Sequence, residues 1–203
     1  MNPYAGIAAL GLEPLARGWG NSHSPALAEH IARARVVIEV GSFQGASVAW
    51  MAAHNETARF YCVDTWLGSP EISAEDMGGI GYQFGRPMLL ERFLSNMVAA
   101  GIDDRVTPII QTSTSGAKIL RAKGIAADLI YIDAGHDYLE CYGDLVSYTP
   151  LLAKGGVMIA DDYEGFPGVR GAVERFCVEA GMTCEIVDGQ AVMRQRYRLQ
   201  VEG

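Results

Sequence analysis

Short runs of β-branched and apolar residues alternate with helical patterns along this chain, and no other feature constrains its fold as strongly. Five of these runs are almost continuously apolar, which is typical of strands buried on both faces of a parallel sheet. The segments between them have helical patterns, so the alternation predicts a doubly wound α/β fold. The predicted strands are residues 35–40, 59–64, 106–111, 128–133 and 156–161, and the predicted helices between them are residues 45–53, 87–100, 115–123 and 138–152.

The C-terminal part of the chain departs from this alternation. A predicted helix over residues 169–181 is followed by two short β-rich runs, residues 183–187 and 191–197. Asp188 and Gly189 lie between these runs, and an Asp-Gly pair in that position is a tight-turn signal. We therefore expect an antiparallel hairpin to close the sheet.

The length of 203 residues, 49% of them hydrophobic, fits one domain with a sizeable core. We divide the chain into an N-terminal helical or lid segment, residues 1–32, and a main domain, residues 33–203. Residues 18–25 and 66–86 are expected to be long loops at the carboxyl edge of the sheet, where such loops often cover a ligand. The alternative for both is a surface insertion without a role.

Charge and composition argue against several classes of partner. The net charge of −8 opposes binding to a nucleic-acid backbone. No apolar run reaches the roughly 18 residues that span a bilayer, and residues 1–20 lack the pattern of a secretory signal. The four cysteines show no CxxC spacing, which favours reduced thiols and a cytoplasmic location. A homo-oligomer stays open, because the N-terminal segment could pack on a neighbouring copy.

The first predicted strand leads into a glycine-rich turn. Gly41 allows a sharp turn, and Gly45 allows the next helix to begin close to the strand, so a ligand could approach backbone N–H groups there. Phe43 stands where a dinucleotide-binding turn needs its second glycine, which argues against a dinucleotide. Glu39 lies near the end of the buried strand and needs a partner, either a cationic ligand or backbone N–H groups of the turn.

The second predicted strand ends in Asp64, 23 residues after Gly41. An acid at this place contacts ribose hydroxyls in nucleoside-binding doubly wound sheets. The alternative is an aspartate that caps its own loop. Trp66 follows and is expected either beside a purine or in the core.

Three carboxylates follow the fourth and fifth predicted strands: Asp133, Asp161 and Asp162. If these strands are neighbours, the carboxylates meet at one edge of the sheet. Two such charges about 4 Å apart repel by about 4 kcal/mol at an effective dielectric constant of about 20. A bound cation would relieve this repulsion, and carboxylate oxygens favour Mg²⁺ or Ca²⁺. The alternative is that Asp162 caps its loop while Asp161 binds a substrate without metal.

His136 follows Asp133 by three residues on the same loop. A neutral imidazole, with an unperturbed pKa of about 6.5, is suited to taking a proton from a hydroxyl at neutral pH. The alternative is a histidine that only orients a carboxylate.

Taken in order, these motifs carry a resemblance. Residues 33–195 resemble class I S-adenosylmethionine-dependent methyltransferases, and most closely the small-molecule O-methyltransferases of the macrocin-type, cephalosporin-hydroxylase-like and catechol O-methyltransferase families. The motifs are the run from Ile38 to Ser47, Asp64-Thr65-Trp66, Ile132-Asp133 with His136 and Tyr138, and Gly155-Gly156 before Asp161-Asp162-Tyr163.

The resemblance implies a Rossmann-like methyltransferase fold, with seven strands of which the last is antiparallel. It implies that Glu39 and Gly41 flank the methionine part of the cofactor, that Asp64 binds its ribose, and that Ser113 lies near its adenine. The full predicted cofactor set is Glu39, Gly41, Ser42, Gly45, Ser47, Asp64, Thr65, Trp66, Ser113 and Asp133.

In metal-dependent members of these families, positions matching Asp133, Asp161 and Asp162 hold Mg²⁺. The catechol enzymes carry a lysine base where this chain has His136, so the base is either His136 or Asp133. We expect methyl transfer from S-adenosylmethionine, assisted by Mg²⁺, to a hydroxyl of a small molecule such as a sugar, a catechol or a natural product. The alternatives are a non-catalytic subunit that binds S-adenosylmethionine and a nicotinamide-dependent oxidoreductase.

Overall fold

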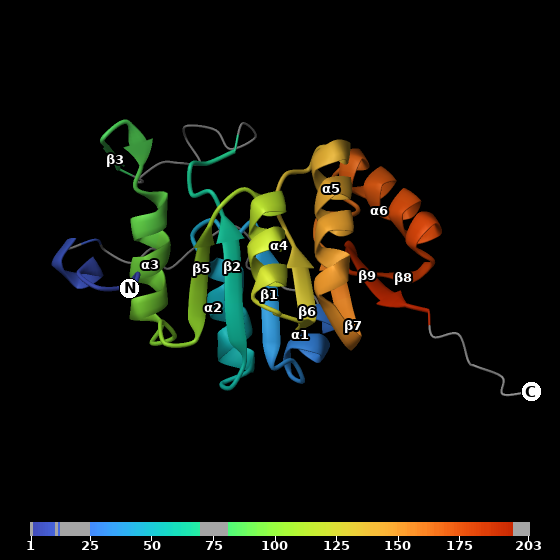
Figure 1. Ribbon diagram of the computed structural model, residues 1–203, viewed down its shortest axis with the longest axis horizontal. Coiled ribbons are helices and arrows are strands. Elements are labelled where there is room, and N and C mark those ends of the chain that lie inside the picture. Colours follow the sequence, from blue (N-terminus) through green and yellow to red (C-terminus); the bar gives the residue numbers. More distant parts are fainter. Residues whose placement is uncertain (1, 11, 13–24, 70–80, 197–203) are drawn as a thin grey trace, which may run out of the picture.

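A computed structural model describes residues 2–10, 12, 25–69 and 81–196 of the chain. Within these residues, seven strands form one sheet (Figure 1). Five neighbouring strands run parallel, and β9 pairs antiparallel with both β7 and β8. The predicted fold class, a doubly wound and mostly parallel sheet with a C-terminal hairpin, is confirmed. The order across the sheet is β5 (Val106–Ile110), β2 (Arg59–Asp64), β1 (Val36–Val40), β6 (Ala127–Ile132), β7 (Leu152–Ala160), β9 (Gln190–Gln195) and β8 (Met182–Val187).

Helices cover both faces of the sheet and create two separate cores. On β1, Val37 packs into one core and Ile38 into the other, and both are fully buried. This arrangement explains why the strands are apolar without alternation. One core contains residues of α1 (Pro25–Ile31), α2 (Ala46–His54) and α3 (Leu89–Ala99), and the other contains residues of α4 (Ser113–Ala122), α5 (Tyr138–Tyr148) and α6 (Pro167–Ala180).

The segment between β2 and α3 contains an element that the sequence did not predict. Two short strands, β3 (Tyr82–Gln83) and β4 (Arg86–Pro87), form a hairpin in the region expected to be a loop. Phe84 and Gly85 connect them, both with positive φ. Each strand has only two residues, so no alternating pattern could reveal the hairpin.

The expected lids fall largely outside the described residues, which do not include 13–24 and 70–80. The described part of the N-terminal segment contains a 3₁₀ helix, Ile7–Leu10, and α1. This part packs into the main domain: the Tyr4 hydroxyl donates to the Val106 carbonyl at 2.9 Å, and Leu27 is fully buried. None of the described helices combines the length and apolar character that crossing a membrane requires.

The chain order of the sheet reverses between β1 and β6, which lie side by side. Open α/β sheets bind ligands at such a switch point, outside the carboxyl ends of the strands. Gly41 ends β1 here, with φ +89°. A Cβ atom at Gly41 would lie 1.9 Å from the Asp133 carbonyl oxygen, so only glycine permits this approach of the two strand ends.

We expect Gly41→Ala to lower the free energy of unfolding by about 3 kcal/mol, measured by urea denaturation. The left-handed conformation and the clash with the Asp133 backbone both contribute to this loss. Gly101→Ala is the matched control, because Gly101 has φ +67° but no atom within 4 Å of an added Cβ. Equal losses in the two variants would contradict the importance of the close approach.

Candidate functional site

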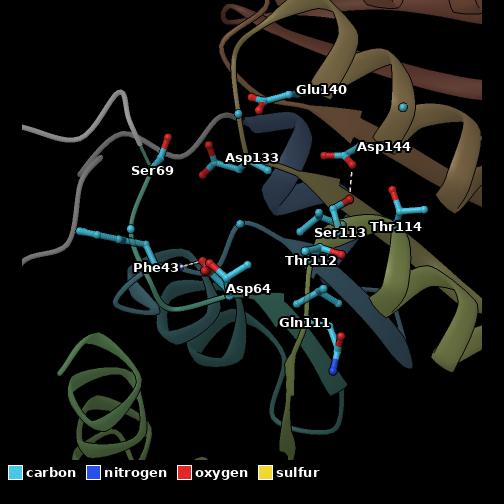
Figure 2. Close-up of a pocket in the computed structure, with 18 of the residues that line it drawn as sticks. Phe43, Asp64, Ser69, Gln111, Thr112, Ser113, Thr114, Asp133, Glu140 and Asp144 are labelled. Carbon is cyan, nitrogen blue, oxygen red and sulfur yellow. Dashed lines mark hydrogen bonds between the residues drawn. The ribbon is translucent and has the colours of Figure 1, made fainter. Parts of the chain in front are cut away.

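A cavity of about 460 Å³ opens at the carboxyl ends of β1, β2, β5 and β6 (Figure 2). Its volume lies within the range of small-molecule sites. The turn after β1, the loop after β2, the loop that leads into α4, the loop after β6 and one side of α5 form its walls. The described lining residues are Val40, Gly41, Phe43, Val63, Asp64, Thr65, Gly68, Ser69, Leu89, Gln111, Thr112, Ser113, Thr114, Asp133, Ala134, Gly135, Leu139, Glu140, Gly143 and Asp144.

The cavity brings together half of the residues that the sequence predicted as cofactor ligands. Gly41, Asp64, Thr65, Ser113 and Asp133 all line it, although they follow four different strands. The other five do not belong to its described lining: Glu39, Ser42, Gly45, Ser47 and Trp66.

Asp64 connects the turn after β1 with the loop after β2. Its Oδ2 accepts from the Phe43 backbone N–H at 2.8 Å, and its Oδ1 accepts from the Trp66 N–H at 2.7 Å. Burial raises the pKa of Asp64, and these backbone N–H groups partly offset the rise. The carboxylate therefore caps its own loop, as the alternative interpretation expected. Each oxygen can still accept a second hydrogen bond from a ligand in the cavity.

Of the two places expected for Trp66, the structure shows the core. Its side chain is 1% exposed and packs against Phe93, with ring centroids 4.8 Å apart. The indole N–H donates to the Phe43 carbonyl at 2.8 Å, so the ring supports the turn from behind. Gly45 has a similar packing role, because a Cβ there would lie 2.5 Å from Met97 Cε. Neither Trp66 nor Gly45 belongs to the described lining of the cavity.

Glu39 is fully buried on β1, one residue before the cavity wall at Val40. The Ser47 hydroxyl donates to its Oε1, while its Oε2 has no hydrogen-bond partner among the described residues. Burial raises the pKa of Glu39 to about 7, the hydroxyls of Ser42 and Ser47 lower it, and the charge of Asp64 raises it further. A buried acceptor without a partner is costly, and a positively charged ligand would relieve that cost.

A second group lies beside the cavity, at the adjacent ends of β6 and β7. One potential ligand atom each from Asp133, His136 and Asp162 lies within 4.8 Å of the others. His136 Nε2 is 3.0 Å from Asp162 Oδ2, and the imidazole stacks on Phe166 with ring centroids 4.0 Å apart. The predicted convergence of the two strand ends is thus present in the structure.

Asp161, which the sequence predicts as a metal ligand, is held in a hydrogen-bond network. Its Oδ2 accepts from the Tyr131 hydroxyl, and its Oδ1 accepts from Gln190 Nε2 at 2.9 Å and from the Asp162 backbone N–H at 3.0 Å. Protein donors thus contact both oxygens of Asp161, while the ligand atoms that converge belong to Asp133, His136 and Asp162. Metal binding by Asp133, Asp161 and Asp162 stays a prediction. Sequence reasoning missed Tyr131 and Gln190, since an apolar strand and a predicted turn contain them without a polar motif.

Asp133 belongs to both the cavity and the second group. Burial raises the pKa of Asp133 well above its ordinary value, and the charges of Asp161, Glu39 and Asp162 raise it further, while His136 lowers it. Four carboxyl groups thus crowd around one strand end. A cation held there would favour the ionised form of Asp133.

Asp144 is a further cavity residue that the sequence analysis did not identify. It lies on α5, is 6% exposed, and accepts a hydrogen bond from the Ser113 hydroxyl at the start of α4. Helical spacing could have identified Asp144 as buried, because it shares the face of α5 that contains the buried residues Cys141, Leu145 and Tyr148.

Comparison with known proteins identifies the family. A family described as "Methyltransferase domain" matches residues 38–163, which include the last three residues of β1, the cavity lining and the group around Asp133. The chain belongs to this family. The residues that match the methyltransferase family begin in β1 and end just after Asp161 and Asp162.

Individual relatives are distant in sequence. An uncharacterised protein, R132 of Acanthamoeba polyphaga mimivirus, is 22% identical over 171 residues, which cover 82% of this chain and 66% of the viral protein. The O-methyltransferase of Bacillus cereus, solved with SAH, is 17% identical with a TM-score of 0.58, covering 94% of this chain and 87% of that one. The O-methyltransferase TomG of Streptomyces achromogenes, solved with SAM, is 16% identical with a TM-score of 0.59, covering 96% and 88%. These structural matches show the shared fold.

We expect Glu39 to make the stability of the unliganded protein depend on pH. The pKa of Glu39 is about 7 in the folded protein and about 4.5 ordinarily, so the folded state binds the extra proton between these values. The contribution of Glu39 is therefore fully present below pH 4.5 and is lost as the pH rises to about 7, a decrease of about 3 kcal/mol.

Glu39→Gln keeps an acceptor for Ser47 but cannot ionise, so urea unfolding of this variant should show a smaller decrease in stability between pH 4.5 and 7. Glu56→Gln, at an exposed position, is the matched control and should follow the unmodified protein. An unchanged slope in Glu39→Gln would show that other groups cause the dependence.

Proposed function

We propose that this protein transfers a methyl group from S-adenosylmethionine to a hydroxyl of a small molecule. The observation that carries the proposal is that Asp133 both lines the cavity and belongs to the group with His136 and Asp162. A cofactor site and a site for acid–base chemistry therefore share one residue. Membership in the methyltransferase family supports the proposal, as do the SAH and SAM bound in two O-methyltransferases of the same fold.

The cavity fits the cofactor in three respects. Gly41 contributes backbone to the wall of the cavity, and Asp64 offers acceptors to the ribose hydroxyls. Glu39, next to the wall, has a buried oxygen without a partner, which a methionine ammonium group would satisfy. The cofactor supplies a methyl group bonded to a positively charged sulfur, which is open to attack by an oxygen in line with that bond.

A substrate hydroxyl must lose its proton to attack efficiently. His136 fits the role of the base, because Asp162 and the ring of Phe166 hold its imidazole beside Asp133. Asp162 is then a positioning residue for the imidazole. Asp133 is the other candidate base that the sequence analysis left open, and its raised pKa favours proton uptake.

The group of Asp133, His136 and Asp162 also fits a divalent cation. The crowding of carboxylates that raises the pKa of Asp133 is the electrostatic feature that a cation would relieve. The carboxylates of Asp133 and Asp162 would hold the ion, and carboxylate oxygens suit both Mg²⁺ and Mn²⁺. His136 would lie beside the ion and stay available as the base. A bound divalent ion would lower the pKa of a coordinated hydroxyl. A substrate with two adjacent hydroxyls could be oriented by it, so we propose a vicinal diol or catechol as the substrate class.

We expect S-adenosylhomocysteine to bind with micromolar affinity in isothermal titration calorimetry, and Asp64→Ala to weaken this binding at least about tenfold by removing acceptors for the ribose. Asp104→Ala, at an exposed position, is the matched control, and thermal melting of both variants checks the fold. Unchanged affinity in Asp64→Ala would contradict the ribose assignment. Binding of NAD instead would favour the oxidoreductase.

Methyl transfer itself is tested with radiolabelled S-adenosylmethionine and a panel of catechols, sugars and monohydroxylated analogues. Turnover on diols, with little on the analogues, supports the proposed substrate class. Cofactor binding without turnover on any substrate would favour the non-catalytic subunit.

We expect the roles of Asp162 and His136 to separate in two measurements. Asp162→Ala should abolish Mn²⁺ binding, followed by electron paramagnetic resonance, because it removes a carboxylate ligand. His136→Ala should retain most of this binding but reduce turnover at least about 100-fold, as loss of a general base does. Asp161→Asn is the comparison variant, since its oxygens already serve Tyr131 and Gln190. If Asp161→Asn alone abolished Mn²⁺ binding, the assignment of Asp162 and His136 would be wrong.

A further inference from the structure

Asp144 is a buried carboxylate in the cavity wall for which the chemistry of methyl transfer has no use. Its Oδ1 accepts from the Ser113 hydroxyl (Figure 2). Among the described residues, none donates a hydrogen bond to its Oδ2. A carboxylate that is 6% exposed and lines a cavity therefore offers a free acceptor to whatever the cavity holds.

The electrostatic surroundings keep this carboxylate an acceptor at neutral pH. Burial raises the pKa of Asp144 to about 6, the charge of Glu140 adds to the rise, and the Ser113 hydrogen bond opposes it. The group is therefore mainly ionised above pH 7. Ser113 is the first residue of α4, and the positive end of the helix dipole favours a negative charge there.

The wall beside Asp144 has space for a flat ring. Gly143 precedes it on α5, and a Cβ added there would meet no atom within 4 Å. Leu139, one helical turn earlier on α5, adds an apolar surface to the same cavity, and Val63 adds another from β2. A purine base buries its faces against such surfaces and leaves its polar edge to be recognised by hydrogen bonds.

S-adenosylmethionine carries few hydrogen-bond donors, and each needs an acceptor when it is buried. The ammonium group is assigned to Glu39 and the ribose hydroxyls to Asp64. The exocyclic amine of the purine is then the donor without an assigned acceptor. Asp144 is a buried acceptor in the cavity wall formed by α4 and α5, across the cavity from Asp64 (Figure 2).

We propose that Asp144, oriented by Ser113, accepts a hydrogen bond from the exocyclic amine of the purine and makes the cavity selective for a 6-amino over a 6-oxo purine. This inference rests on the proposed function, since it names how the same cavity recognises its cofactor. A 6-oxo purine would place its carbonyl oxygen against a carboxylate, which leaves two acceptors facing each other without a donor.

The test compares S-adenosylhomocysteine with S-inosylhomocysteine, its 6-oxo analogue, by isothermal titration calorimetry at pH 7.5. The unmodified protein should bind the 6-amino ligand at least about 30-fold more tightly. In Asp144→Asn, the Ser113 hydroxyl can donate to the amide oxygen, which turns the amide NH₂ toward the ligand. This variant should therefore lose or reverse the preference.

Asp188→Asn makes the same chemical change in the exposed turn between β8 and β9 and should keep the preference of the unmodified protein. If Asp144→Asn does not fold, as judged by thermal melting, the N6,N6-dimethyl analogue of S-adenosylhomocysteine tests the unmodified protein alone. That analogue lacks the amine donor and should bind as weakly as the 6-oxo ligand.

The outcomes separate the two proposals. If the unmodified protein binds both ligands within threefold, or if Asp144→Asn keeps the original preference, the role of Asp144 is overturned while the cofactor assignment stands. Tight binding of the dimethyl analogue would overturn it as well. If the unmodified protein binds neither S-adenosylhomocysteine nor its analogues, the proposed function itself fails.

Discussion

The site depends on the close approach of the chain at the ends of β1 and β6. Gly41 has no side chain, so its Cα can lie against the Asp133 carbonyl, and a single methyl group would separate the two strand ends. The Asp133 N–H donates to the Val40 carbonyl at 2.9 Å, which continues the pairing of the strands past their formal ends. Asp133 is therefore held at the boundary between the cavity and the group formed by His136 and Asp162.

Several acidic groups gather around this strand end and the cavity, and they differ in how many of their oxygens accept hydrogen bonds from the protein. Asp161 and Asp64 have both oxygens occupied by protein donors, so each stabilises its surroundings: Asp161 joins β6, β7 and β9, and Asp64 joins two loops. Glu39 and Asp144 each have one oxygen bonded to a serine hydroxyl and the other without a donor among the described residues. Recognition of the cofactor is inferred from Glu39 and Asp144, through the oxygen that has no donor, and from Asp64, whose oxygens can each accept a second hydrogen bond.

Much of the fold could be predicted because its signals are local. Buried parallel strands are continuously apolar, and the Asp188-Gly189 turn revealed the hairpin of β8 and β9. The candidate site could be located for the same reason: Gly41, Asp64 and Asp133 each end a predicted strand, and parallel strands end at one edge. The hairpin of β3 and β4 escaped prediction, because two-residue strands produce no periodic pattern.

The partners of the site carboxylates could not be predicted, because they depend on contacts between distant segments. Sequence position made Asp161 and Asp162 equivalent, yet Gln190, 29 residues after Asp161, takes one of its oxygens and Tyr131 takes the other. The sequence allowed Trp66 to lie either beside a ligand or in the core. In the structure it lies in the core, where its indole N–H donates to the Phe43 carbonyl. Asp144 had no motif at all, and only the packing of α4 against α5 shows that its carboxylate meets Ser113. A strand end thus shows where acidic residues gather, but the donors supplied by other elements decide which of those residues a ligand can use.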